Sequence, residues 1–288
     1  MNQNDMHTRA MLVSLRISAC SFRKYDRKVS QDTATAHGTT LDAGRYNKHL
    51  LPGDCPSFKA LNSHLADLRV KHYAQTLAWS DDGWRLLPIA NYTAYTDMVR
   101  AGFHTADDLL NTFVSDYPAL RLEATRILNG MYQDTDYPSD VRSRYSWGIE
   151  YAPIPQGGDF RVTLAASEIE AIAKRTEERV SDAFKDAQRD AVARLAECVS
   201  KIHERLAQPD AIFRDSLIGN ARELCDVLTR LNVAGDATLE TLRKQTELLA
   251  MSEPQTLRDN ADVRQATADE AQRILDSMMG AYGANILG

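Results

Sequence analysis

The sequence predicts a mainly α-helical protein of the α+β class, with a small antiparallel β-sheet and a long C-terminal helical arm or bundle. Apolar and polar residues alternate over residues 12–18, which is typical of a half-buried strand. Apolar residues recur at a mean step of about 3.7 over residues 169–206, which indicates a long, nearly straight helix. Of the 21 Phe, Tyr and Trp residues, 18 lie before residue 161. We therefore expect an aromatic-rich α+β domain at residues 1–165 and a helical domain at residues 166–288.

The N-terminal half is predicted to combine short helices with short strands. Helical spacing and turn residues predict helices at residues 21–38, 41–50, 57–77, 92–115 and 118–131. The last two are separated at Tyr117 and Pro118, because proline disfavours helix at the residue before it. Strand-like runs follow at residues 147–151 and 160–164, and we expect them to pair with the N-terminal strand as a small sheet.

The C-terminal half is predicted to contain helices only. Ser167 and Glu170 form a capping-box pattern, which marks the start of the long helix. Further helices are expected at residues 211–232, 237–251 and 254–279. The expected N-caps and helix stops are Asp236, Ser252, Gly235 and Gly280. Such a run of helices usually forms a bundle or an antiparallel arm.

The composition is typical of a cytoplasmic protein. The 288 residues carry 34 Lys and Arg against 40 Asp and Glu, a net charge of −6, which argues against a protein that is basic everywhere. No stretch approaches roughly 18 uninterrupted apolar residues, so we expect no membrane span. The N-terminus lacks the basic and apolar order of a signal peptide. The cysteines show no CxxC spacing and are expected to be reduced thiols: Cys20, Cys55, Cys198 and Cys225.

No residue pattern predicts catalysis, a metal or a cofactor. Gly157–Phe160 reads Gly-Gly-Asp-Phe, the core of the diguanylate cyclase signature, but the αβ domain of that family does not surround it, so a turn before a strand is favoured. His64 and His72 are eight residues apart, and no third ligand has diagnostic spacing. The cysteines and serines occur in no nucleophile signature. We therefore predict that the protein is not an enzyme, although an active site without a known signature stays open.

Basic and aromatic residues are interleaved near the N-terminus. Residues 1–75 hold 11 Lys and Arg against 6 Asp and no Glu, a net charge of +5, while residues 76–160 carry −6 and residues 161–288 carry −5. Cations at short intervals suit a phosphate backbone, and flat side chains suit stacking with unpaired bases. The predicted nucleic-acid-binding residues are Arg16, Arg23, Lys24, Tyr25, Arg27, Lys28, Arg45, Tyr46, Lys48, His49, Lys71 and Tyr73. The alternative is that the aromatic residues belong to the core and the cations only solvate the surface.

Four short strings resemble a family of phage and mobile-element proteins: MLVSLRIS at residues 11–18, RKYDRKV at 23–29, DAGRYNK at 42–48 and GDFRV at 158–162. The order of a short strand, basic helices and a long helical arm is also similar to this family. Its Drc-like members are single-stranded-DNA-binding cofactors of phage RNA polymerase. The resemblance covers most of the chain and implies binding to locally melted DNA, recruitment of a phage RNA polymerase, the cytoplasm of a bacterial host, and a fold unlike the OB barrel.

Two functions therefore stay open. The first is a single-stranded nucleic-acid-binding protein, a cofactor in transcription or replication, whose C-terminal helices mediate self-association or partner docking. The second is a helical adaptor that recruits an ATPase or another machine without binding nucleic acid, because relatives of the resembling family also accompany AAA-type ATPases and von Willebrand-type domains. The long helix predicts a homo-oligomer in either case, and its step does not fix the stoichiometry. Preference for DNA or RNA also stays open.

Overall fold

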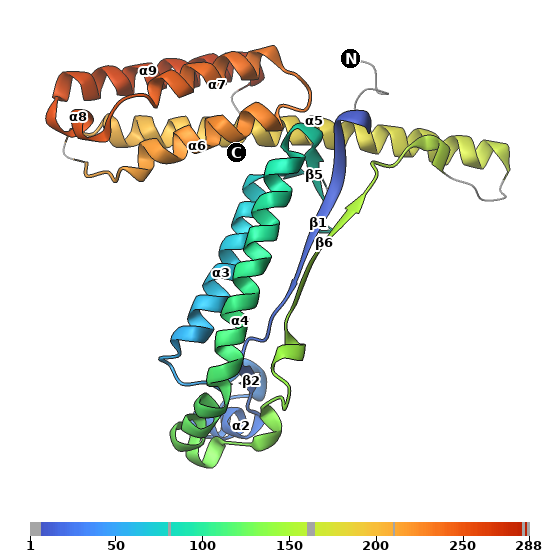
Figure 1. Ribbon diagram of the computed structural model, residues 1–288, viewed down its shortest axis with the longest axis vertical. Helices are drawn as coiled ribbons and strands as arrows, with labels where there is room; N and C mark the ends of the chain where they lie inside the picture. Colours follow the sequence, from blue (N-terminus) through green and yellow to red (C-terminus); the bar gives the residue numbers. More distant parts are fainter. Residues whose placement is uncertain (1–6, 80–81, 160–164, 210, 284–285, 287–288) are drawn as a thin grey trace. The chain divides into compact units, whose positions relative to one another are not determined.

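The computed structural model describes residues 7–79, 82–159, 165–209, 211–283 and 286. The chain is mainly helical and adds small antiparallel sheets, which confirms the predicted fold class (Figure 1). Two compact units divide it, and each is described by itself. The bundle unit comprises residues 1–14, 72–96 and 150–288, and the ribbon unit comprises residues 15–71 and 97–149.

This division differs from the predicted boundary at residue 165. Residues 72–96 and 150–159 belong with the C-terminal helices because they carry side chains into the same core. Leu77 and Leu86, both fully buried, pack in one apolar cluster with Leu195 of the long helix. The periodicity of the sequence shows where a helix runs but not which distant strands cover its apolar face.

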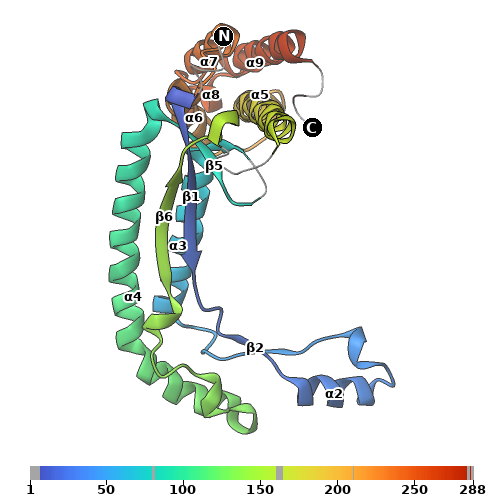
Figure 2. The same ribbon diagram turned by 90° about the vertical axis from the view of Figure 1, so that its right-hand side faces the viewer.

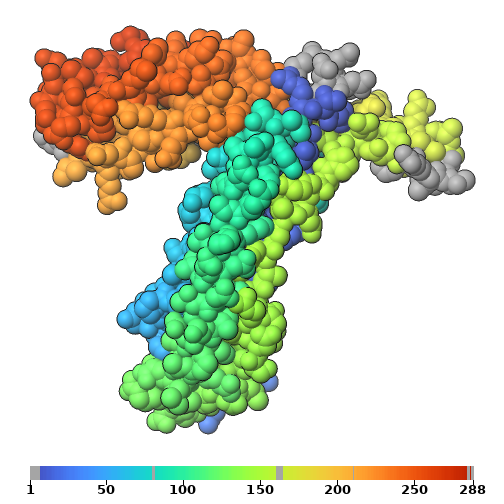
Figure 3. Space-filling view, in the orientation of Figure 1, coloured from blue at the N-terminus to red at the C-terminus, as the bar shows by residue number. Residues whose placement is uncertain are grey.

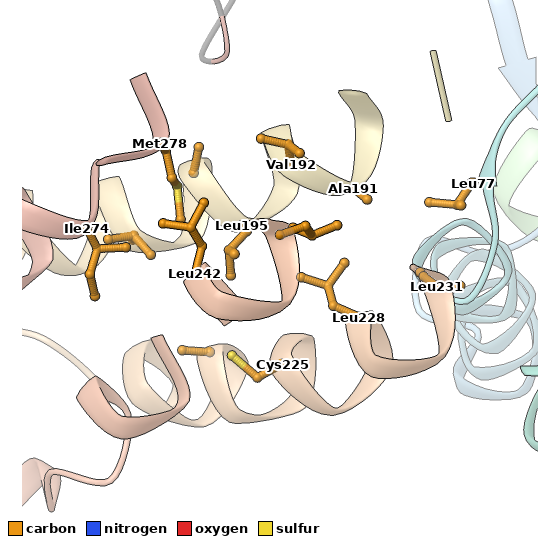
Figure 4. Packing of buried hydrophobic residues seen from close by; sticks show 14 of the residues in the cluster. Leu77, Ala191, Val192, Leu195, Cys225, Leu228, Leu231, Leu242, Ile274 and Met278 are labelled. Carbon is orange, nitrogen blue, oxygen red and sulfur yellow. The ribbon is translucent and has the colours of Figure 1, made fainter. Parts of the chain in front are cut away.

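The bundle unit is built on one long helix. Helix α5 (Ala166–Leu206) is 41 residues long, which confirms the expected helix of about 40 residues. It packs with α6 (Ser216–Leu231), α7 (Ala237–Leu249) and α9 (Ala261–Tyr282), and the short helix α8 (Pro254–Asp259) packs on α9. Figure 4 shows the apolar side chains that fill the space between these helices: Leu195, Leu228, Leu242, Ile274 and Met278 among them. Each large side chain buried here contributes about 1.5–3 kcal/mol.

The helix ends agree with the sequence in part. Asp236 is the N-cap of α7, as predicted, and its side chain accepts from the backbone N–H groups of Thr238 and Leu239. Ser167 and Ser252 are not N-caps, since those positions belong to Ala165 and Glu253. Gly235 has a φ of +63°, but it lies in the loop after α6 has ended. Gly280 lies inside α9, which stops at Gly283 with a φ of +91°.

The larger sheet has the strand order β4-β5-β1-β6. Strand β1 (Ala10–Ser18) confirms the predicted N-terminal strand, and β6 (Ser146–Ala152) is its predicted neighbour. The other predicted strand, at residues 160–164, lies outside the described residues. The sequence did not predict β4 (Leu77–Ala78) and β5 (Arg85–Pro88), which pair antiparallel and are too short to show an alternating pattern.

The ribbon unit contains β2 (Arg23–Tyr25), α2 (Arg27–Ala36), β3 (Asn47–His49) and most of α3 (Pro56–Ala74) and α4 (Tyr92–Leu128). Aromatic rings form its core. Phe22 packs edge-to-face on Phe58 at a centroid distance of 5.4 Å, and Phe113 lies 5.7 Å from Phe22. The segment that follows α4 runs beside that helix in the space-filling view (Figure 3). Its Tyr145 packs edge-to-face on Phe113 of α4 at a centroid distance of 6.1 Å.

Three expectations about this unit are wrong. The helix predicted from residue 21 begins only at Arg27, because Arg23–Tyr25 forms strand β2. Residues 41–50 form a 3-10 turn (Leu41–Ala43) and then strand β3, because β3 finds a pairing partner in β2. Helix α4 continues through Pro118 instead of breaking before it. The exposed proline removes one backbone donor, whereas Tyr117 beside it is buried and donates its hydroxyl to the carbonyl of Pro138 at 3.2 Å, so tertiary packing outweighs the local preference.

Candidate nucleic-acid interface

Nine of the twelve predicted binding residues lie on one substructure, which we call the basic ribbon and define as residues 23–49. Strands β2 and β3 pair antiparallel, with Arg23 opposite His49 and Tyr25 opposite Asn47. Between them, Asp26 caps the start of α2 by accepting from the backbone N–H of Val29. In Figure 2 the ribbon extends to one side of the C-terminal part of α4. Short strands and a capped helix thus collect residues from both ends of a 27-residue segment.

The ribbon carries cations that no carboxylate neutralises. Arg23, Arg27 and Lys28 are exposed, and none of them forms an ion pair within the described part of the chain. Arg27 and Lys28 occupy the first turn of α2, which contains no acidic residue. The partial positive charge of a helix N-terminus disfavours cations at this place by about 0.3–1 kcal/mol and favours anions. The carboxylate of Asp26 already caps this helix N-terminus, so the exposed cations of Arg27 and Lys28 are the groups there that suit a bound phosphate.

Half-exposed aromatic rings lie among these cations. Tyr25 is 40% exposed and Tyr46 is 41% exposed. The guanidinium of Arg45 lies 5.8 Å from the centre of the Tyr25 ring, within cation–π range. The backbone N–H of Tyr46 donates to the hydroxyl of Ser30 at 2.9 Å, which fixes the chain beside α2. The two tyrosines therefore present flat surfaces without belonging to the apolar core.

Two of the predicted lysines form ion pairs with Asp136. Lys48 is 3% exposed, and its Nζ lies 2.7 Å from Oδ2 of Asp136 and donates to the carbonyl of Met131 at 2.8 Å. Lys24 contacts the other carboxylate oxygen. Burial opposes ionisation of Asp136, yet the two ammonium groups overcome it and hold the pKa of this carboxyl below its ordinary value. Lys48 is thus a structural residue, and Lys24 is only partly available.

The remaining predicted residues lie elsewhere. Lys71 pairs with Asp67 one helical turn away at 2.8 Å, and Arg16 is exposed on β1 outside the basic ribbon. Tyr73 belongs to the bundle unit, where the guanidinium of Arg85 lies 4.5 Å from its ring centre. The structure therefore does not bring these three residues together with the basic ribbon as one surface of the ribbon unit.

A groove of about 700 Å³ adjoins the basic ribbon. Arg23, Tyr46 and His49 line it from the ribbon side. The rest of its wall comes from the residues that flank the ribbon, from the start of α3 and from the distant end of α4: Ser21, Phe22, Leu51, Pro52, Gly53, Cys55, Phe58, Lys59, Asn62, Ile127, Leu128 and Met131. No pattern in the sequence predicts this groove, since it forms only when the end of α4 packs beside the start of α3.

Within the described residues, no group of three His, Cys, Asp or Glu side chains could hold a metal ion. His72 bonds to the hydroxyl of Tyr95 at 2.7 Å, and burial lowers its pKa to about 4, so it is neutral and part of the core. His64 bonds to the carbonyl of Gly102. The Gly157–Asp159 segment is a 3-10 turn, and Phe160 lies outside the described residues.

Burial likewise raises the pKa of the Cys198 thiol to about 11 and that of Cys225 to about 12, so neither is an activated nucleophile. No helix among the described residues combines the length and the apolar character needed to span a bilayer. These features offer no chemistry that competes with the basic ribbon as a functional site.

No family model, no curated protein and no solved structure matches this chain. The charges and aromatic rings of the basic ribbon are therefore the features that indicate a function.

Proposed function

We propose that this protein binds single-stranded nucleic acid, with DNA as the first candidate, largely without sequence preference and through the basic ribbon. The observation that carries the proposal is the grouping of three unpaired cations with two half-exposed tyrosines. Arg23, Arg27 and Lys28 have no acidic partner among the described residues, and Tyr25 and Tyr46 lie on the same short segment. Cations and stacking rings together are the components of non-specific single-strand binding.

Each component has a distinct task in this proposal. The three cations contact phosphates, and the N-terminus of α2 adds its partial positive charge at Arg27 and Lys28. Tyr25 and Tyr46 stack with unpaired bases, and Arg45 extends the flat surface over Tyr25. A duplex offers the same phosphates but keeps its bases stacked on each other. The proposal therefore includes a preference for the single strand.

Kinship with the Drc-like phage cofactors belongs to the same proposal. The support is the likeness of the four strings, two of which, at residues 23–29 and 42–48, lie within the basic ribbon. In that setting the protein acts in the cytoplasm of a bacterial host, recruits a phage RNA polymerase to melted DNA and works as a homo-oligomer. Tight single-strand binding would support the role in DNA binding. Recruitment of the polymerase needs a separate pull-down experiment.

The test is a fluorescence-anisotropy titration of the protein into labelled single-stranded and duplex oligonucleotides at about 50 and 300 mM salt. The expected result is binding that favours the single strand and weakens steeply with salt, because released counterions drive the association. Absence of binding to either form at micromolar protein would overturn the proposal. Binding that is insensitive to salt would overturn the phosphate contacts.

A helical adaptor is the second candidate, and exposed apolar side chains in the bundle unit favour it. Leu248 and Met251, three residues apart at the end of α7, are 66% and 68% exposed, and Ile212 is 93% exposed. Contiguous exposed apolar patches are typical of a protein contact, so the neighbouring pair Leu248 and Met251 carries this candidate. For an adaptor, reversing the charges of Arg23, Lys24, Arg27 and Lys28 should leave partner capture intact, while Leu248→Glu with Met251→Glu should abolish it.

A further inference from the structure

We propose that the groove beside the basic ribbon receives one unpaired nucleobase of the bound strand. This inference rests on the proposed single-strand binding and adds a subsite in which one base is shielded from solvent. The groove volume of about 700 Å³ falls within the range of about 300–1,000 Å³ found for small-molecule pockets, which is large enough for one base.

The floor of the groove is apolar and aromatic. Phe22 and Cys55 are buried, and Phe58 is half-buried with its ring packed edge-to-face on Phe22. The ring of Phe58 therefore belongs to the core and also faces the groove that it lines. Stacking of a base on an aromatic side chain contributes about 1–3 kcal/mol, whatever the base. An apolar floor with one accessible ring suits a flat heterocycle better than it suits a charged or a flexible group.

The rim of the groove carries polar and cationic groups. Arg23 and His49 are opposite each other in the β2–β3 pair, and both line the groove. The Asn62 side chain donates to the carbonyl of Phe58 at 3.0 Å, which leaves its amide oxygen free to accept from the N–H of a base. A base seated on Phe58 would thus keep its own phosphate next to the cations of the ribbon. This charge complementarity selects a nucleotide of an anionic strand over an apolar peptide.

The experiment compares a single strand of about 12 nucleotides with an abasic strand of the same length and charge. Both strands meet the same cations, but only the first can fill the groove. Gly53→Leu is the filling variant, because Gly53 is exposed, lines the groove and has open space where a Cβ would stand. Its matched control is Gly280→Leu, an exposed glycine of α9 that also has open space around it.

The wild-type protein is expected to bind the base-bearing strand more tightly than the abasic one. Gly53→Leu should lower affinity for the base-bearing strand about tenfold and leave the abasic strand within about twofold, whereas Gly280→Leu should change neither. A second pair tests the same groove from α4. Ile127→Glu adds a negative charge at a lining residue, and Leu122→Glu adds it at an exposed residue of the same helix outside the groove.

A direct readout needs no variant. A strand that carries photoreactive 4-thiothymine should crosslink to Phe58 or Met131 in the wild-type protein. Crosslinks confined to Tyr25, or a Gly53→Leu protein that binds the base-bearing strand like wild type, would overturn the groove proposal and leave single-strand binding in place. Failure of the wild-type protein to bind either strand would instead overturn the proposed function itself.

Discussion

The basic ribbon and helix α5 both display many cations, but they use them differently. On α5, five cations pair with a carboxylate three or four residues away: Lys174, Lys185, Arg189, Arg194 and Lys201. On the ribbon, Arg23, Arg27 and Lys28 have no such partner among the described residues. The number of basic residues in a segment therefore does not measure the positive charge that is available to a ligand. What matters is whether the local geometry provides a carboxylate.

Helical spacing explains much of the difference. Residues three or four apart are neighbours on a helix, and five of the eight Lys and Arg side chains of α5 find a carboxylate at this spacing, whereas Arg175, Arg179 and Arg205 do not among the described residues. Lys28 stands four residues before Asp32, yet no ion pair forms between them. A lysine that precedes its acidic partner has the less favourable order. Lys174 and Glu178 have this order too, and at 4.0 Å they form the loosest of the five pairs on α5.

The largest expected effect concerns the carboxylate on which two ribbon cations depend. Asp136→Asn leaves the buried ammonium of Lys48 with only the carboxylate of Asp26, which lies 3.6 Å away, so the ribbon unit should lose about 3 kcal/mol of unfolding free energy, the lower end of the cost of breaking a buried pair. The matched control is Asp134→Asn in the same turn. Asp134 is 73% exposed in its pair with Arg121, and its loss should change the free energy of unfolding far less, because solvent screens an exposed ion pair. Urea unfolding measures both, and equal effects would contradict the distinction between buried and exposed partners.

The same carboxyl group should make stability depend on acid. Because the pKa of Asp136 is held below its ordinary value, the folded state is stabilised while the group is ionised, above about pH 4. This contribution disappears as the pH falls through the folded-state pKa. Melting temperatures of the wild type measured between about pH 6 and pH 2 should therefore fall more steeply than those of Asp136→Asn. Parallel curves would show that another group carries the acid sensitivity.

Charge reversal is expected to give the next largest effect. Replacing Arg23, Arg27 and Lys28 by Glu should weaken single-strand binding about 100-fold and flatten its salt dependence, because three phosphate contacts become repulsive. Replacing Lys174, Lys185 and Lys201 of α5 by Glu makes the same change in net charge. Anisotropy should show little loss for that second protein. If both triple variants bind equally weakly, the overall charge governs binding and the basic ribbon does not.

A smaller loss is expected when one ring is removed. Tyr25→Ala should weaken single-strand binding about tenfold, because it deletes a stacking surface and the seat of Arg45. Tyr92→Ala is the control, since Tyr92 is equally exposed at 39% but lies in the bundle unit. Binding of an abasic strand should be nearly unchanged by either substitution. An unchanged affinity of Tyr25→Ala for the base-bearing strand would remove stacking from the mechanism.

The smallest effects compare single paired and unpaired lysines. Lys28→Gln should reduce the salt slope of binding by about one unit. Lys201→Gln breaks its pair with Glu197 and should cost about 0.3–0.5 kcal/mol of stability while leaving strand affinity unchanged. Thermal melts and anisotropy at several salt concentrations separate the two outcomes. An effect of Lys201→Gln on the salt slope would show that paired cations of α5 also contact the strand.

The sequence reveals the features that repeat along the chain and misses those that depend on distant contacts. The step of the apolar residues predicts α5, and alternation predicts β1, because both patterns are local. Burial of Lys48 could not be predicted, since its partner Asp136 lies 88 residues further along the chain. The groove depends on α4 in the same way. Pro118 shows the reverse case, in which a strong local signal is overruled by packing.

Helix α2 buries only two small residues, Ser30 and Ala34, and no large apolar side chain. A segment attached so weakly opens at a low free-energy cost, well before the unit that carries it unfolds. Its amide hydrogens should therefore exchange with solvent sooner than those of α9, which buries Ile274, Leu275 and Met278. A bound strand would have to hold α2 closed, so part of its interaction energy would be spent on ordering the helix. Strand binding would then slow the hydrogen exchange of α2. The affinity of the protein for the strand would depend on the free energy of ordering α2 as well as on the charge of the ribbon.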